Sequence, residues 1–189
     1  MVRRPLSVRP WRVIGSMPGG TEKRTKWERA AVAVAIIIVL GLAAMFSLSF
    51  TAKRPDMLGV TGGKLAPCPS SPNCVSTQAS DAEQRMEPVA FAGDGDDALS
   101  RLRTIIDGMP GGKVITCRSG YLQVEFTSRL FRFVDDVEFL VDDEKHIIHF
   151  RSASRVGYSD LGANRRRMTR IRDEFAQQLS PGSSMSPEK

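Results

Sequence analysis

An uncharged apolar segment near the N-terminus constrains this chain more than any other feature. Residues 31–50 read AVAVAIIIVLGLAAMFSLSF, twenty positions without a charged side chain. As a helix the segment would span about 30 Å, which is the hydrocarbon thickness of a bilayer. A helix packed on a soluble core normally keeps a polar face, and this segment has none. We therefore predict one transmembrane helix over residues 30–52.

The distribution of charge orients the predicted helix. Residues 1–54 contain ten basic and two acidic side chains, a net charge of +8, whereas the remaining 135 residues contain 17 basic and 19 acidic ones. Basic flanks of a transmembrane helix stay on the cytoplasmic side. We expect residues 1–29 in the cytoplasm and the chain after residue 52 outside it, in the periplasm if the membrane is a bacterial inner membrane.

Cleavage of the segment as a signal peptide is the alternative to an anchor, because Ser47-Leu48-Ser49 weakly resembles a small-residue cleavage site. After residue 54 the net charge is −2, so the basic excess belongs to the membrane flank. This balance excludes nucleic-acid binding by the folded part of the chain. The membrane, contacted through residues 30–52, is the one partner that the sequence predicts.

Composition divides the rest of the chain. Residues 54–73 read RPDMLGVTGGKLAPCPSSPN and are rich in glycine, proline and serine, which is typical of a linker followed by an ordered loop. The C-terminal SPGSSMSPEK has the composition of a disordered tail. We predict a linker over residues 53–64, a folded domain over 65–179 and a disordered tail over 180–189.

Hydrophobic periodicity predicts an α+β fold for this domain. One apolar stripe at helical spacing follows Asp94, Asp96 and Asp97, which suit a helix N-terminus, and a second begins at Met168. The stripes consist of Ala98, Leu99, Leu102, Ile105, Ile106 and Met109, and of Met168, Ile171, Phe175 and Leu179. Strand patterns occupy residues 88–91, 113–118, 121–128, 130–141 and 145–152. We expect an antiparallel sheet of four to five strands with the two helices on one face.

Strand alternation singles out Asp135. One face of the run FRFVDDVEFLV carries Phe131, Phe133, Asp135, Val137, Phe139 and Val141. Asp135 is the one charge in this apolar row, and a buried carboxylate is costly unless a donor pairs with it. Arg151 and Arg155 are the nearest candidate donors. Asp135 therefore forms a structural ion pair, serves as a functional carboxylate, or is exposed because the strand register differs.

The loop that precedes the last helix, RSASRVGYSDLGANRRRM, mixes residue types that packing alone rarely brings together. Ser152, Ser154 and Tyr158 supply hydroxyls, and Asp160 or Asn164 can cap the helix. Arg165, Arg166 and Arg167 crowd the first turn, where the helix dipole disfavours cations. Arginines at a helix N-terminus predict a pocket for a phosphate, carboxylate or sulfate. The alternative is a solvated basic face with one arginine paired to an acid.

Three cysteines remain to be placed. Cys68 and Cys74 flank five residues, and outside the cytoplasm we expect them to form a disulfide. A metal site is less consistent with this spacing, and no histidine lies near. Cys117 falls in an apolar strand, where we expect a buried thiol.

Three stretches, CPSSPNCVSTQ, FVDDVEF and RSASRVGYSDLGANRRR, follow one another along the chain. Together they resemble the bacterial and plastid family of domains of unknown function numbered 1499, over about residues 65–179. The matching positions are Cys68, Pro72, Asn73, Cys74, Val75, Ser76, Asp135, Asp136, Arg151, Ser152, Ser154, Arg155, Gly157, Asp160, Gly162, Asn164 and Arg165. Thr77 stands where members often have serine. The resemblance implies a domain boundary and a set of motif residues, but no activity.

Our first hypothesis for the function is a membrane-tethered extracytoplasmic binding or accessory domain, which recognises a small polar or anionic ligand or an envelope partner. The candidate ligand-binding residues, which would converge at one end of the sheet, are Asn73, Ser76, Asp135, Arg151, Ser152, Ser154, Arg155, Tyr158, Asp160, Asn164 and Arg165. The second hypothesis is a hydrolase-like enzyme with Asp135 or Asp160 as acid or base. A purely structural interaction domain is the third. We predict no cofactor and no metal site.

Overall fold

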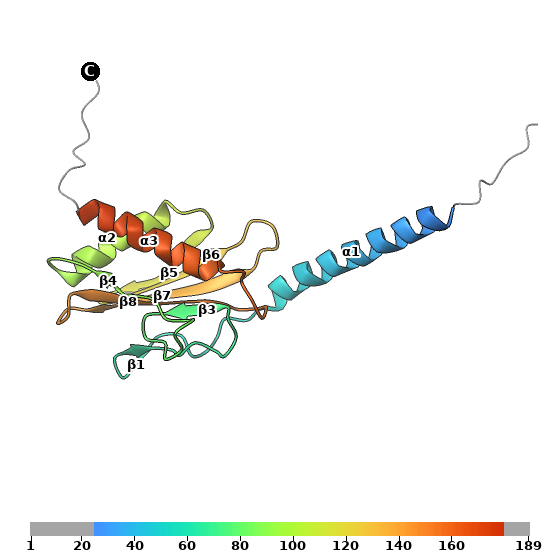
Figure 1. The fold of residues 1–189 in the computed structure, drawn as a ribbon. Coiled ribbons are helices and arrows are strands. Elements are labelled where there is room, and N and C mark those ends of the chain that lie inside the picture. The colour runs from blue at the N-terminus through green and yellow to red at the C-terminus, as the bar shows by residue number, and fades with distance from the viewer. Residues whose placement is uncertain (1–24, 180–189) are drawn as a thin grey trace, which may run out of the picture. The chain divides into compact units, whose positions relative to one another are not determined.

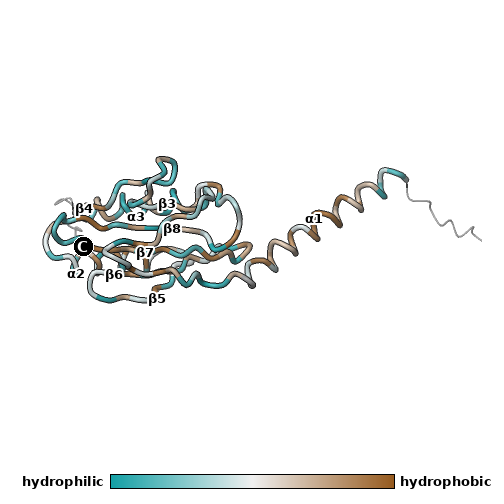
Figure 2. The backbone as a smooth tube through the Cα atoms, turned by 90° about the horizontal axis from the view of Figure 1, so that it is seen from below, coloured by the Kyte–Doolittle hydropathy of each residue, from teal (hydrophilic) through white to brown (hydrophobic). Residues whose placement is uncertain are grey.

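The computed structural model describes residues 25–179, so the predicted cytoplasmic residues 1–24 and the predicted tail 180–189 lie outside the described residues. Helix α1 (Lys26–Thr51) contains the whole uncharged segment. It opens with a capping box, in which the Thr25 N–H donates to Glu28 Oε2 at 2.8 Å and the Glu28 N–H donates to Thr25 Oγ1 at 3.4 Å. The helix is long and apolar enough to cross a membrane, and its hydrophobic residues run along most of its length (Figure 2).

The described residues divide into two units, of which the first ends at Leu40 and the second begins at Gly41. The second unit holds an antiparallel sheet of six strands in the order β3-β8-β7-β6-β5, with β4 paired to β8 as well. The strands are β3 (Cys74–Ser76), β4 (Val89–Ala90), β5 (Gly112–Arg118), β6 (Tyr121–Thr127), β7 (Val134–Asp142) and β8 (Ile147–Ser154). Helices α2 (Gly95–Asp107) and α3 (Ala163–Leu179) cover one face of the sheet (Figure 1). The predicted α+β class is confirmed.

The core lies between the two helices and the sheet. Helix α2 begins at an N-cap, Asp94, whose side chain accepts from the backbone N–H groups of Asp96 and Asp97. Its apolar stripe and that of α3 pack on alternate residues of the strands, such as Val137 and Phe139, which are fully buried. The apolar residues that recur every 3.6 positions in the helices and every two positions in the strands therefore pack together in one layer.

The observed strands differ from the predicted ones in two places. Strand β3 was not predicted, because three residues that begin at the cysteine closing a Pro- and Ser-rich disulfide loop are too few to carry a strand pattern. Strand β7 begins at Val134 rather than at residue 130. Residues 128–133 form a loop that Ser128 closes, since its Oγ accepts from the Phe133 N–H at 2.9 Å. Arg132 in this loop has a positive φ of 59°, which breaks the extended backbone.

Strand β5 is the free edge of the sheet. Its register against β6 shifts between Val114 and Thr116, as in a β-bulge, and none of its residues is buried. The expected burial of Cys117 is therefore wrong, because the thiol lies on an edge strand that the helices cover only in part, and it is exposed. Lys113 and Arg118 are exposed on the same strand.

The opposite face of the sheet is covered by the chain that follows α1. We call residues 54–65 the strap. It contains the hairpin of β1 (Val60–Thr61) and β2 (Lys64–Leu65), and β2 contacts both β7 and β8. Leu65 is buried, and its N–H donates to Gln78 Oε1 at 2.9 Å. Much of the predicted linker 53–64 therefore packs on the sheet.

Gly111 provides a test of the turn that leads into β5. Its φ is +81°, and a Cβ at this position would lie 2.5 Å from the Thr127 carbonyl oxygen. Gly120 has a similar φ of +70° with nothing within 4 Å. We expect Gly120→Ala to cost about 1–2 kcal/mol, the strain of a left-handed residue. Gly111→Ala should cost clearly more, because main-chain atoms must move. Urea unfolding of the two variants measures the difference, and equal costs would contradict the clash.

Candidate functional site

Six buried or half-buried side chains tie three separate parts of the chain together on the helix side of the sheet. We call them the Asn164 network, and its members are Asn73, Asp135, Ser152, Ser154, Asn164 and Arg167. Asn164 is fully buried and donates to the Asn73 carbonyl at 2.9 Å and to Ser154 Oγ at 3.1 Å. Its own Oδ1 accepts from Ser152 Oγ at 2.6 Å. The network thereby joins the disulfide loop, strand β8 and helix α3.

Asp135 is buried on the helix side, and both of its oxygens have a partner. Ser154 Oγ donates to Oδ1 and Arg167 Nη2 donates to Oδ2, each at 2.5 Å. The prediction that Arg151 or Arg155 pairs with Asp135 is wrong, because both arginines bind carboxylates on the other face of the sheet. The geometry is that of a structural ion pair.

The remaining motif residues of the loop are also engaged or lie at the surface. Asp160 accepts from the N–H groups of Gly162 at 2.9 Å and Asn164 at 2.7 Å, so it caps α3. The exposed Arg165 reaches backbone carbonyls, and Tyr158 is exposed. The pocket that Asp160 and Arg165 line has a volume of only about 130 Å³, below the size of ordinary ligand sites.

The disulfide loop lies next to the Asn164 network. Cys68 and Cys74 are bonded, which confirms the predicted disulfide. Inside the loop, Asn73 Nδ2 donates to the Gly157 carbonyl at 2.6 Å and its Oδ1 accepts from Ser71 Oγ at 2.7 Å. The CPSSPNC loop and the loop that precedes α3 are therefore adjacent in space, as predicted, but their polar groups bind one another.

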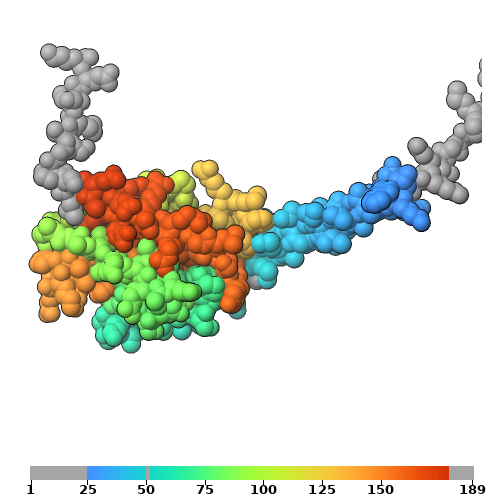
Figure 3. All heavy atoms as spheres, in the orientation of Figure 1, coloured from blue at the N-terminus to red at the C-terminus, as the bar shows by residue number. Residues whose placement is uncertain are grey.

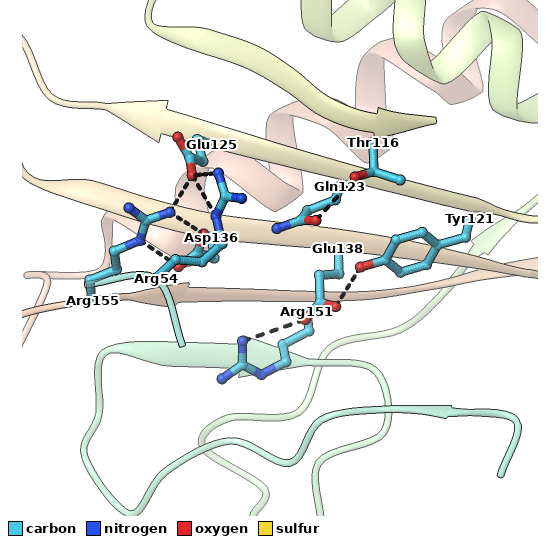
Figure 4. Close-up of polar contacts among 9 residues, drawn as sticks. All are labelled: Arg54, Thr116, Tyr121, Gln123, Glu125, Asp136, Glu138, Arg151 and Arg155. Atoms are coloured by element: carbon cyan, nitrogen blue, oxygen red, sulfur yellow. Dashed lines mark hydrogen bonds and ion pairs between the residues drawn. The ribbon is translucent and has the colours of Figure 1, made fainter. Parts of the chain in front are cut away.

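A second polar layer lies on the strap side of the sheet (Figure 4). Its first part is the Arg155 network of Arg54, Glu125, Asp136 and Arg155. Arg155 binds Asp136 through two hydrogen bonds, at 2.8 Å from Nε and 2.7 Å from Nη2, and it also donates to Glu125. Arg54 of the strap donates to the same Glu125 oxygen. The network fastens the start of the strap to β6.

Charge pairing shifts the pKa values within the Arg155 network. The hydrogen bond to Asp136 raises the pKa of Arg155, and burial opposes the shift only in part. Burial by itself would raise the pKa of Glu125, but hydrogen bonds from Arg54 and Arg155 outweigh it and lower that pKa. Glu125 and Arg155 are therefore held in their ionised forms.

The second part of the layer is the Arg151 cluster, which consists of Tyr121, Gln123, Glu138 and Arg151. Glu138 is fully buried, and its Oε1 accepts from the Tyr121 hydroxyl at 2.7 Å and from the Gly59 N–H of the strap at 2.6 Å. Burial, with the neighbouring Glu138, raises the pKa of Tyr121. Tyr121 is therefore held as a hydrogen-bond donor.

Arg151 is the least satisfied charge among the described residues of this layer. It is only 4 % exposed, and its Nη1 lies 3.7 Å from Glu138 Oε2, too far for a hydrogen bond. Within residues 25–179, Arg151 Nε and Nη1, Glu138 Oε2 and Gln123 Nε2 are buried without a hydrogen-bond partner. Burial lowers the pKa of Arg151, and Glu138 opposes this. Leaving such groups unpaired costs about 1–3 kcal/mol each, and more for charged groups.

A cavity of about 500 Å³ opens on the same side of the sheet, between the strap and the segment after β3, and no residue of the Arg151 cluster lines it. Met57 and Lys64 of the strap line it together with Ser76. Ser76 pairs directly with Arg151 across β3 and β8, so their side chains point to the same face of the sheet. The cavity and the unpaired polar atoms therefore lie on the same side of the domain.

The sequence-predicted residues thus separate onto two faces. Asn73, Asp135, Ser152, Ser154 and Asn164 meet on the helix side, whereas Ser76, Arg151 and Arg155 lie on the strap side. Within the described residues, no group of three or more His, Cys, Asp and Glu side chains could hold a metal ion. The sheet keeps the two sets apart, and in the part of the chain that the structure describes the buried side-chain atoms without a partner all lie on the strap side.

Sequence reasoning missed Tyr121, Gln123, Glu138 and Arg167. Alternation does place Glu138 with Asp136 on the face of β7 opposite Asp135, but no role was predicted for that face. The signal that could have corrected this is the density of polar side chains on facing strands, since Tyr121, Gln123 and Glu125 also alternate on β6. Arg167 was treated as one of three adjacent cations, although only its position in α3 reaches Asp135.

The profile of a family described as "Protein of unknown function (DUF1499)" matches residues 64–175. The chain belongs to this family. The resemblance inferred from the three motifs is confirmed, and the matched region contains the whole Arg151 cluster and the whole Asn164 network. Most of the strap precedes the part that matches DUF1499. No curated protein and no solved structure matches the chain significantly.

Removing arginines from the two parts of the strap-side layer should have opposite effects. Arg155→Met leaves Asp136 buried without its partner, so we expect a loss of about 3–5 kcal/mol. Arg151→Met combined with Glu138→Gln keeps the bonds from Tyr121 and Gly59 while removing both charges. We expect this double variant to be as stable as the native chain or more stable by up to about 4 kcal/mol. Urea unfolding tests both, and an equally large loss in the double variant would make Arg151 a structural ion pair.

Acid should weaken the attachment of the strap through Glu125. The folded-state pKa of Glu125 lies below its ordinary value of 4.5, so its contribution to stability is complete above 4.5 and is lost as pH falls through the folded pKa. The difference in unfolding free energy between the native chain and Glu125→Gln should therefore shrink below that pH. A difference that stays constant between about pH 6 and pH 3 would show that Glu125 is not held ionised.

Proposed function

We propose that this DUF1499 member is a membrane-anchored binding protein whose site is the Arg151 cluster. Its ligand is a small polar solute that carries an acidic oxygen beside a hydroxyl or amine group. One observation carries the proposal: the Arg151 side chain is buried, yet its Nε and Nη1 have no hydrogen-bond partner in the described part of the chain, and Glu138 Oε2 and Gln123 Nε2 on the next two strands are also unpaired. Buried polar groups are nearly always hydrogen-bonded, so an exception in a native fold is a candidate ligand site.

The chemistry of the unpaired atoms defines the class of ligand. Arg151 Nε and Nη1 and Gln123 Nε2 are donors, and they suit an acidic oxygen. Glu138 Oε2 is an acceptor when ionised, and it suits a hydroxyl or amine. A bidentate contact to a carboxylate or phosphate is the interaction in which arginine exceeds lysine. A cavity of about 500 Å³, within the size range of small-molecule sites, opens on the same side of the sheet and is lined by Ser76, the cross-strand neighbour of Arg151.

Binding is better supported than acid–base catalysis by the motif carboxylates. Asp135 has Arg167 and Ser154 as partners, and Asp160 caps α3, so each has a structural duty in the fold. A general base needs to be within reach of a bound substrate. Among the carboxylates of residues 25–179, the one with a free buried oxygen is Glu138, which lies in the proposed binding site.

Two features support an extracytoplasmic location for the site. The basic flank of α1 predicts a cytoplasmic N-terminus, which puts the domain on the other side of the membrane. The Cys68–Cys74 disulfide is compatible with an oxidising compartment such as the periplasm. A solute-binding domain in this location would meet its ligand before the ligand reaches the membrane.

Thermal unfolding of the full chain in detergent tests the site with three small probes. Glycolate has an acid and a hydroxyl, acetate has the acid alone, and ethylene glycol has hydroxyls alone. We expect glycolate to raise the melting temperature most, because only it satisfies both sides of the cluster. A ligand at a hundred times its dissociation constant adds about 2.7 kcal/mol, which circular dichroism resolves easily.

Arg151→Met is the decisive variant, and Arg165→Met is its matched control, since Arg165 is exposed and reaches only backbone carbonyls. The glycolate shift should disappear in Arg151→Met and persist in Arg165→Met. A shift of equal size in all three proteins, or none in the native chain at about 100 mM glycolate, would contradict binding at this cluster.

A further inference from the structure

Exposed apolar side chains gather at one end of the sheet. Outside α1, four large hydrophobic residues in the described part of the chain are strongly exposed, namely Met57, Leu130, Tyr158 and Leu161. The last three are 74 %, 77 % and 85 % exposed. A soluble surface can carry single exposed residues of this kind, but their concentration in one region marks a contact surface.

The three residues belong to two loops that flank each other. Loop 128–133 joins β6 to β7, and loop 155–162 joins β8 to α3. The register pairs Thr127 with Val134 and Asp135 with Ser154, so both loops leave the same end of the sheet. We call these two loops the loop end. A space-filling view shows loop 128–133 projecting from the domain (Figure 3).

The charge of the loop end is basic. Arg129 and Arg132 are exposed in the first loop, and Arg165 and Arg166 are exposed immediately after the second. The one carboxylate within the two loops is Asp160, which is engaged as the cap of α3. A groove of about 500 Å³ runs between loop 128–133 and α3, and Arg129, Arg166 and Arg170 line it. Exposed leucine and tyrosine among arginines is the composition of a surface that binds at a membrane interface.

The course of the chain keeps this end near the membrane if α1 spans it. Arg54 follows the last residue of α1 by three positions, which span at most about 11 Å. Arg54 is ion-paired with Glu125, and the loop that contains Leu130 starts three residues further along, about 10 Å in a strand. The Arg155 network thus fixes the membrane exit of the chain to the strand that leads into the loop end.

We propose that the loop end rests on the membrane surface, with Leu130, Tyr158 and Leu161 in the interface and the arginines on anionic headgroups. The contact depends on α1 as an anchor but is independent of any ligand at the Arg151 cluster. Tyrosine is favoured at the headgroup level, and each arginine near an anionic surface adds attraction that salt screens. The occupant is a lipid surface rather than a protein, because the tether holds the loop end beside lipid.

Spin labels on the full chain in lipid nanodiscs test this contact. Cys117→Ser leaves the disulfide as the remaining cysteine pair, and single labels are introduced through Leu130→Cys, Leu161→Cys or Glu144→Cys. Glu144 is the matched control, since it is exposed in the turn between β7 and β8, at the opposite end of the sheet. In discs with phosphatidylglycerol, collisions with an aqueous nickel complex should fall several-fold at positions 130 and 161 relative to position 144.

Charge reversal separates a lipid contact from a protein contact. Arg129→Glu with Arg132→Glu, or discs of pure phosphatidylcholine, should restore aqueous accessibility at positions 130 and 161. All of these positions are exposed, so the fold is retained, as circular dichroism can verify. Labels at 130 and 161 that are as accessible as at 144 in anionic discs would overturn the proposal. Protection that survives both the charge reversal and the neutral lipid would also overturn it, in favour of a protein partner.

Discussion

Three carboxylates on one strand organise this domain. Strand β7 presents an acid to the helices and two acids to the strap, and each meets an arginine from a different part of the chain. The pairs are Asp135 with Arg167 of α3, Asp136 with Arg155 after β8, and Glu138 with Arg151 of β8. Because a buried charge is tolerated only beside its partner, these pairs fix α3 and the loop after β8 against the sheet. The Asn164 network then fills the space between them.

The three pairs differ in their hydrogen bonding, and this difference separates the structural pairs from the candidate site. Two of them are fully hydrogen-bonded, while Arg151 and Glu138 face each other without a hydrogen bond in a buried layer. Within residues 25–179, the buried side-chain atoms that lack a hydrogen bond belong to Arg151, Glu138 and the neighbouring Gln123, and stability alone does not account for them. The Asp135 and Asp136 pairs therefore hold the domain together, and the Glu138–Arg151 pair marks the candidate site.

Much of the fold followed from periodicity, since the stripes of α2 and α3 and the strands that they cover depend on local spacing alone. The disulfide followed from the spacing of the cysteines and the expected compartment, and the burial of Asp135 followed from strand alternation. The partner of Asp135 did not, because Arg167 reaches it across 32 residues and only the packing of α3 selects it from three adjacent arginines. The site could not be predicted either, because the strap has the composition of a linker. Contacts such as those with Glu138 and Glu125 show that the strap covers the sheet.

If α1 anchors the protein in a membrane, the free edge at β5 has a further consequence. Anchored copies are confined to two dimensions, so a bare row of backbone donors and acceptors on each would meet others often and invite intermolecular strand pairing. The bulge between Val114 and Thr116 interrupts that row, and Lys113 and Arg118 place like charges along it. Such interruptions are how sheets avoid aggregating edge to edge. The irregularity of β5 thus keeps crowded neighbours from joining their sheets.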